Sequence, residues 1–205
     1  MPQIKLTYFD VDGGRGEPVR IAFHAAGVDF EDHRIAFPEF REKQATFRFH
    51  AVPVMEVDGV VVTQSNGMTR YAGKLAGLYP EDDLQALYCD EVMGVCEDVS
   101  NAIVRTFGLE GDALQKAREA LVEGRLSVYI KGLGELLERG GGKYFADNRL
   151  TVADLKVLPT TRWLMSGMLD HVPTDLVSRL SPGVAEHAKR IANEPIVKAY
   201  YESRA

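Results

Sequence analysis

Two polar side chains stand where a predicted strand gives way to a predicted helix. Gln64 and Ser65 follow the apolar run VVVT, and the segment SNGMTRYAGKLAG that starts at Ser65 has helical patterning. As an N-cap, Ser65 would leave backbone N–H groups and the positive end of the helix dipole facing outward, where a carboxylate can bind. Gln64 adds a donor and an acceptor beside it. The pair therefore predicts a carboxylate site; the alternative is that Ser65 only caps its helix.

A phenol and a guanidinium flank a glycine-rich loop near the start of the chain. Tyr8 lies near the end of the alternating segment KLTYF, and Arg15 lies in the DGGRGEP that follows. Open α/β sheets bind ligands at the carboxyl ends of their strands, which is where Tyr8 would lie. Arg15 is close enough in sequence to orient or acidify that phenol. The alternatives are a core or edge aromatic and a solvated loop arginine.

The patterning of the first 77 residues predicts the scaffold for these side chains. It predicts a strand at 5–9, a helix from Pro18 to Gly27, a strand at 29–35, a short helical segment at 37–49, two strands (VPVMEV and VVVTQ) joined by an Asp58-Gly59 type I′ turn, and a helix from Ser65 to Gly77. This βαβαββα order, with Pro53 opening the third strand, is the thioredoxin-like arrangement. At that position a cis and a trans proline are equally compatible with the sequence; a cis bond would expose the backbone of Val52 to an extended ligand.

Strand signals stop after a linker at 78–83. Long helical stretches follow at 84–109 and 113–139, and further helices begin near Thr151, Asp175 and Pro182. Thr151 and Asp154 in LTVADL form a close variant of a capping box, which is a structural signal. We therefore predict an α/β thioredoxin-like N-terminal domain at 1–80 and an all-α C-terminal domain at 84–205.

Composition narrows the possible functions. The chain has 205 residues and a net charge of −6, which argues against nucleic-acid binding. It has neither a signal-peptide pattern nor a long apolar run, so we expect a cytoplasmic protein. The five histidines show no metal-ligand spacing, and no metal is expected. The first cysteine is Cys89 and no serine precedes Ser65, which argues against thioredoxin-fold enzymes that place a cysteine or serine at the first helix.

Several motifs together resemble the cytosolic glutathione S-transferases, most closely their sigma class. They are KLTYF, GRGEPVR, EDHRI, VPVMEVDG, QSN and RYAGKLAGLYP in the first half, and the acidic pair at 97–98 and LTVADL in the second. Each motif alone is weak, but their order and spacing are specific. The resemblance is close over residues 4–80 and looser over the remainder of the chain.

The resemblance implies a glutathione site. Gln64 and Ser65 would hold the γ-glutamyl carboxylate, and the backbone of Val52, before Pro53, would pair with the cysteinyl unit. The glycyl carboxylate would meet Phe40 together with Lys43 or Gln44. Asp98 would reach the γ-glutamyl ammonium of the neighbouring subunit, which implies a homodimer. The chain departs from the class in having Phe40 in place of a tryptophan, Gln44 where the family lysine aligns, and one extra residue in the VDGG loop.

The implied reaction is conjugation of the glutathione thiolate to small hydrophobic electrophiles. Tyr8 would donate its O–H to the sulfur, with electrostatic support from Arg15. The electrophile pocket would lie between the two halves of the chain, with candidate walls at Val11, Arg105, Phe107 and Tyr200. Two alternatives remain: a glutathione-binding structural or carrier protein without significant turnover, and a glutathione-dependent isomerase of the prostaglandin type.

Overall fold

A four-stranded mixed sheet forms the centre of the N-terminal domain in the computed structural model, which describes residues 2–204. The strands are β1 (Ile4–Phe9), β2 (Glu31–Ile35), β3 (Val54–Val57) and β4 (Val60–Val62), in the spatial order β2-β1-β3-β4. β1 runs parallel to β2 and antiparallel to β3, and β3 and β4 form a hairpin. Because β1 is central, its Leu6 is fully buried, and the end of this strand is where Tyr8 lies.

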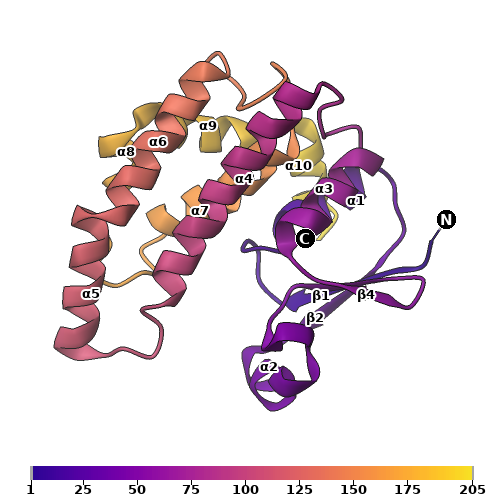
Figure 1. Cartoon of the computed structure of the whole chain (residues 1–205), viewed down its shortest axis with the longest axis horizontal. Coiled ribbons are helices and arrows are strands. Elements are labelled where there is room, and N and C mark those ends of the chain that lie inside the picture. The colour runs from indigo at the N-terminus through magenta and orange to yellow at the C-terminus, as the bar shows by residue number, and fades with distance from the viewer. Residues whose placement is uncertain (1, 205) are drawn as a thin grey trace.

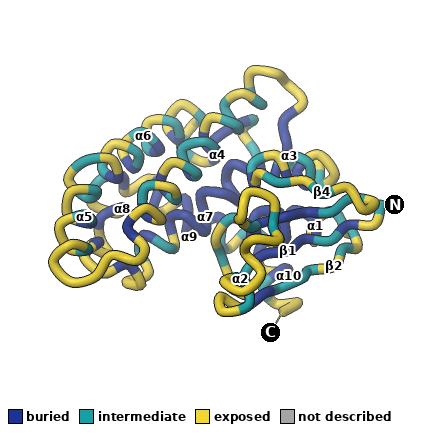
Figure 2. Tube along the Cα trace, turned by 60° about the horizontal axis from the view of Figure 1, so that its bottom comes forward, coloured by how far each residue is buried: buried dark blue, intermediate teal, exposed yellow. Residues whose placement is uncertain are grey.

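The helices of this domain lie on opposite sides of the sheet. α1 (Glu17–Ala25) and α3 (Ser65–Leu75) lie between the sheet and the C-terminal domain, whereas α2 (Phe37–Lys43) projects from the other side (Figure 1). α2 and the short 3₁₀ turns Gln44–Thr46 and Arg48–His50 contain no buried residue (Figure 2). Aromatic contacts hold this segment to the sheet, since the Phe9 ring lies 4.5 Å from that of Phe37 and 5.1 Å from that of Phe40.

Within the described residues, the secondary structure of the C-terminal domain consists of helices joined by loops, with no strand. Its helices are α4 (Asp83–Val104), α5 (Gly111–Glu123), α6 (Arg125–Arg139), α7 (Val152–Met165), α8 (Leu176–Leu180), α9 (Pro182–Ala192) and α10 (Pro195–Glu202). α7 is the core helix, because every residue from 151 to 161 is buried. Its start has the predicted capping box between Thr151 and Asp154. The predicted βαβαββα domain followed by an all-α domain is thus confirmed.

One local prediction in the first half, the type I′ turn, is also confirmed, and one question that the sequence left open is answered. Asp58 and Gly59 have φ angles of 48° and 79°, both positive as a type I′ hairpin requires. The Val52–Pro53 peptide bond, for which the sequence allowed either isomer, is cis.

The second half differs from the prediction in three places. The first long helix, predicted over 84–109, ends at Val104. The single helix predicted over 113–139 is interrupted at Gly124 and forms two helices. The backbone is tightly packed there, since a Cβ added to Gly124 would lie 2.9 Å from the carbonyl oxygen of Ala120. The C-terminal helix α10, which begins at Pro195, was not predicted. Its signal was a proline suited to the first turn of a helix. None of the helices described has the length and apolar character needed to cross a membrane.

Candidate active site

Tyr8 is enclosed by the loop that follows β1. Its side chain is 6% exposed, and its Oη accepts a hydrogen bond of 3.0 Å from the backbone N–H of Arg15. A Cβ on Gly14 would lie 2.5 Å from Tyr8 Oη, and one on Gly16 would lie 2.6 Å from a ring carbon. Glycine is therefore required at both positions for the loop backbone to approach the phenol this closely. This explains the GGRG sequence and fixes the orientation of Tyr8.

The environment of Tyr8 keeps its phenol protonated. Burial raises the pKa of Tyr8, and the N–H of Arg15 and the charges of Arg15 and Arg20 oppose that rise only in part. Arg15 thus lowers the pKa of the phenol, as expected, but desolvation outweighs the nearby cations and the net pKa is raised. Arg15 also orients Tyr8 through its backbone N–H. Since that N–H occupies a lone pair of the oxygen, the Tyr8 proton remains available to a ligand.

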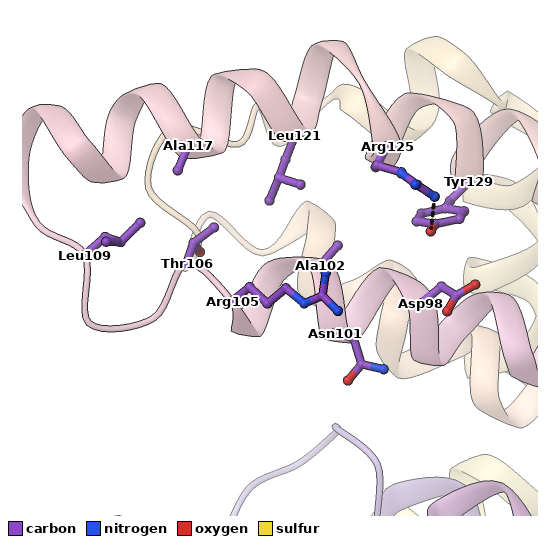
Figure 3. Close-up of a pocket in the computed structure, with 10 residues that line it drawn as sticks. All are labelled: Asp98, Asn101, Ala102, Arg105, Thr106, Leu109, Ala117, Leu121, Arg125 and Tyr129. Carbon is purple, nitrogen blue, oxygen red and sulfur yellow. Dashed lines mark hydrogen bonds between the residues drawn. The ribbon is translucent and has the colours of Figure 1, made fainter.

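The side chain of Arg15 bridges the two domains. Its Nε donates to Glu97 Oε2 at 2.7 Å, and its Nη2 donates to Asn101 Oδ1 at 2.9 Å, both on α4. Asn101 points away from α5 in Figure 3, toward the side from which this loop approaches. The loop also meets the core helix, because a Cβ on Gly13 would lie 3.8 Å from Cβ of Pro159. Tyr8 thus lies beside the junction of the sheet domain and the helical domain.

Glu97 is the centre of a partly buried ionic network. Its Oε1 accepts from Ser65 Oγ and from Lys156 Nζ, each at 2.6 Å, while Oε2 accepts from Arg15. Lys156 Nζ also donates to Ser65 Oγ at 3.1 Å. Burial opposes ionisation of Glu97, but Lys156 and Arg15 outweigh it and lower the pKa of the carboxyl to about 2. Glu97 is therefore an anion at any physiological pH.

The sequence did not identify this network. In the sequence, Glu97 stands out only as one half of the acidic pair at 97–98, and nothing near Lys156 points to a binding site. The signal was a lysine between apolar residues of a core helix, in LKVLP at 155–159. Such a lysine must find an anion, because an unpaired buried charge is costly.

Gln64 and Ser65 lie next to this network, with one correction. α3 begins at Ser65, so that Gln64 holds the cap position, and Ser65 Oγ bonds Glu97 instead of capping the helix. Gln64 has φ 75° and ψ 101°, which is an uncommon backbone conformation for a residue other than glycine. Conformations of this kind cost about 1–3 kcal/mol and cluster at ligand sites. The exposed Gln64 side chain and the buried Ser65 therefore lie together at the start of α3.

The other predicted glutathione contacts lie on both sides of β1. The Phe40 ring packs on Phe9, whose ring centroid lies 5.2 Å from that of Tyr8. Lys43 pairs with Glu39 at 2.8 Å, and Gln44 donates to the carbonyl of His50 at 3.2 Å. Val52 is half-buried, and Pro53 is buried at the start of β3.

The four candidate walls of the electrophile pocket occupy different surroundings. Val11 is half-buried in the loop after β1, and Phe107 is 57% exposed with its ring edge-on to Trp163. Tyr200 is 4% exposed, packs against His24 of α1 and bonds Arg204, so it offers almost no surface to a ligand.

Arg105, just after α4, instead faces a groove between α4 and the helices α5 and α6. It lines this groove of about 580 Å³ together with Asp98, opposite Arg125 and Tyr129 (Figure 3). The described residues therefore do not gather the four predicted walls into one cavity.

Neither cysteine is suited to be a nucleophile. Cys89 and Cys96 are free and buried, and burial raises the pKa of each thiol to about 12. A thiol with such a pKa is almost entirely protonated at neutral pH. In the described part of the chain, no three histidine, cysteine or acidic side chains gather as a metal ion would require.

Comparison with known proteins identifies the family. The profile of the glutathione S-transferase N-terminal domain matches residues 4–74, and that of the C-terminal domain matches residues 97–204. Glutathione S-transferase 1 of Ascaris suum is 33% identical over 77% of this chain and 78% of its own length. The structure of prostaglandin synthase D of Nilaparvata lugens superposes with a TM-score of 0.85 at 28% identity, covering 100% of this chain and 99% of that one. A sigma class glutathione S-transferase of Fasciola hepatica gives 0.81 at 26% identity, covering 100% and 97%. The chain belongs to the glutathione S-transferase family.

Proposed function

We propose that this protein conjugates the thiolate of glutathione to small hydrophobic electrophiles, with Tyr8 as the catalytic residue. One observation carries the proposal: Tyr8 is a buried phenol whose raised pKa keeps it protonated and whose oxygen accepts the Arg15 N–H, so that its own proton can be donated to a ligand. A thiolate above this hydroxyl would receive that proton as a hydrogen bond. Arg15 holds the phenol through its backbone, and its guanidinium is part of the network around Glu97.

The energy of one hydrogen bond suffices for this activation. A free thiol has a pKa of about 8.5, and lowering it by two units requires about 2.7 kcal/mol. A hydrogen bond to a charged group contributes about 1.5–3 kcal/mol. The sulfur then forms a C–S bond with the electrophilic carbon. In a substitution the leaving group departs with the electron pair of its bond, and in an addition the resulting carbanion takes a proton from water.

Glutathione would bind across the end of the sheet nearest Tyr8. Its γ-glutamyl carboxylate would lie at Gln64 and Ser65, where the strained backbone of Gln64 supports a ligand role. The Val52 backbone would pair with the cysteinyl unit. Phe40 and either Lys43 or Gln44 would contact the glycyl end. The walls around the electrophile would include Val11 and Phe107, with Arg105 and Tyr200 brought in only if side chains rearrange.

The first test is turnover by the unmodified protein. We expect calorimetry to show glutathione binding, and we expect an aryl halide to be conjugated at a rate proportional to enzyme. Binding without conjugation of several electrophile types would instead indicate a carrier. Absence of binding would overturn the proposal.

A second candidate activity is isomerisation of a prostaglandin-like endoperoxide with glutathione as cofactor. The similarity to the prostaglandin synthase D of Nilaparvata lugens favours it. The two activities use the same thiolate and differ in the electrophile. Incubation with an endoperoxide, followed by product analysis, separates them: isomerised product without glutathione conjugate would establish this second activity.

We also propose that the protein acts as a homodimer in which Asp98 binds the γ-glutamyl ammonium of the partner's ligand. Asp98 is exposed on α4, adjacent to Glu97 but on the side that faces Tyr129 (Figure 3). Asp98→Asn should raise the Kd for glutathione about tenfold by removing one charge-assisted contact, without dissociating the dimer. Light scattering and calorimetry measure the two effects. A monomeric wild-type protein, or unchanged affinity in the variant, would contradict this role.

A further inference from the structure

Lys156 is a buried cation at the start of α3. It is 2% exposed on the core helix α7, and its Nζ lies 2.6 Å from Glu97 Oε1 and 3.1 Å from Ser65 Oγ. The lysine comes from 59 residues beyond Glu97 and 91 residues beyond Ser65, so only the packing of α7 brings it there. Burying a lysine in this position costs desolvation free energy unless its charge is paired with an anion.

The charge of Lys156 makes the network around Ser65 net positive. Glu97 contributes −1 and Arg15 contributes +1, which alone would leave the network neutral. Lys156 makes it net positive, and the N-terminal end of α3 adds a partial positive charge of its own. Without the lysine, an ionised carboxylate would lie 2.6 Å from Ser65 Oγ and would repel a second carboxylate arriving at that hydroxyl.

The hydrogen bonds around Ser65 lead to the same conclusion. An ammonium has three donors and no acceptor, so Lys156 can only donate to Ser65 Oγ and Glu97 Oε1. In the absence of a ligand the Ser65 proton goes to Glu97. When a carboxylate arrives, Ser65 can turn its proton to the ligand, because Glu97 Oε1 keeps the hydrogen bond from Lys156. The lysine thus frees Ser65 without leaving Glu97 unsatisfied.

We propose that Lys156 is a positioning residue that sets the affinity of this protein for the α-carboxylate of the γ-glutamyl group. It acts through Glu97 and Ser65 and does not touch the reacting sulfur. The inference rests on the proposed function, since it takes glutathione as the ligand at Gln64 and Ser65.

The experiment compares two ligands that differ in one carboxylate. One is glutathione, and the other is 4-aminobutyryl-cysteinylglycine, which lacks only the γ-glutamyl α-carboxylate. Lys156→Met should raise the Kd for glutathione about 10- to 100-fold, the range expected for loss of one unit charge within several ångströms of a carboxylate in a partly buried site. The Kd for the analogue should change less than about threefold. In the conjugation assay the KM for glutathione should rise while kcat stays within about threefold.

A double variant that keeps the net charge of the wild-type network tests whether the effect is electrostatic. Lys156→Met with Glu97→Gln removes the ion pair and returns the network to the single positive charge of Arg15. We expect it to recover most of the glutathione affinity that Lys156→Met loses. Melting temperatures of all variants show whether each is folded, and a folded single variant with restored affinity in the double variant supports the proposal.

The outcomes separate the inference from the proposed function. Equal loss of affinity for the two ligands, or no loss for glutathione, would overturn the role of Lys156. So would a double variant that binds glutathione as weakly as Lys156→Met. If the wild-type protein does not bind glutathione, the proposed function itself fails, and the role of Lys156 fails with it.

Discussion

Replacement of Tyr8 by phenylalanine is expected to lower the conjugation rate about 10- to 100-fold at pH 7. The variant loses the hydrogen bond to the thiolate, so the thiol pKa returns toward about 8.5 and only a few per cent of bound glutathione is ionised. The Kd for glutathione should change little, because the carboxylates and the ammonium of the tripeptide bind elsewhere. Stopped-flow or steady-state assays of aryl halide conjugation measure the effect.

The pH profile makes this expectation specific. Because the variant's thiol ionises near pH 8.5, its rate should rise through that pH and approach the wild-type rate above it. The loss should therefore shrink from about 10- to 100-fold at pH 7 to a few-fold near pH 9. Wild-type activity should rise through a pH about two units lower, where the stabilised thiol ionises.

A matched tyrosine provides the control. Tyr144 is also nearly buried, and its Oη donates to Glu194 at 2.9 Å in the helical domain. Tyr144→Phe should keep both the rate and the pH profile of the wild-type protein. If Tyr8→Phe behaves in the same way as this control, then another group activates the thiol and the catalytic assignment of Tyr8 is wrong.

Replacement of Asp154 by alanine is expected to have the largest effect on stability. Its side chain is fully buried and has partners on both oxygens. Oδ2 accepts from the N–H of Thr151 at 2.8 Å and from its hydroxyl at 3.0 Å. Oδ1 accepts from the N–H of Phe145 at 3.1 Å and pairs with His187 Nε2 at 2.8 Å. Asp154 thus connects the start of α7 to the preceding loop and to α9.

The alanine variant would leave these buried groups without a partner. Breaking a buried pair of this kind costs about 3–5 kcal/mol. For a chain of this size, each kcal/mol lowers Tm by about 2–4 °C, so a loss of roughly 10 °C is expected in thermal unfolding.

Asp82, an exposed N-cap that accepts the N–H of Gln85 at 2.9 Å, is the matched control. Asp82→Ala should cost only about 1 kcal/mol. If Asp154→Ala and Asp82→Ala lose equal amounts of unfolding free energy, then burial does not make Asp154 the more important residue for stability.

Local sequence signals determined much of the fold. The alternation of KLTYF, the Asp58-Gly59 turn and the Thr151–Asp154 capping box act over a few residues, and each appears in the structure where it was predicted. The absence of a cysteine before Cys89 and of a serine before Ser65 likewise argued against thioredoxin-fold enzymes that place such a nucleophile at the first helix. These signals are reliable because backbone conformation and capping depend on near neighbours.

Tertiary structure alone decided the electrostatics of the site. Burial sets the direction of the Tyr8 pKa, and a single loop sequence does not report how deeply its phenol lies. The contacts among Arg15, Glu97 and Lys156 join residues from the first loop, α4 and α7. Such ion pairs depend on how distant helices pack, and sequence separation carries no information about that packing. The sequence therefore showed which groups are available for chemistry, whereas the packing of the two domains determined which of these groups come into contact.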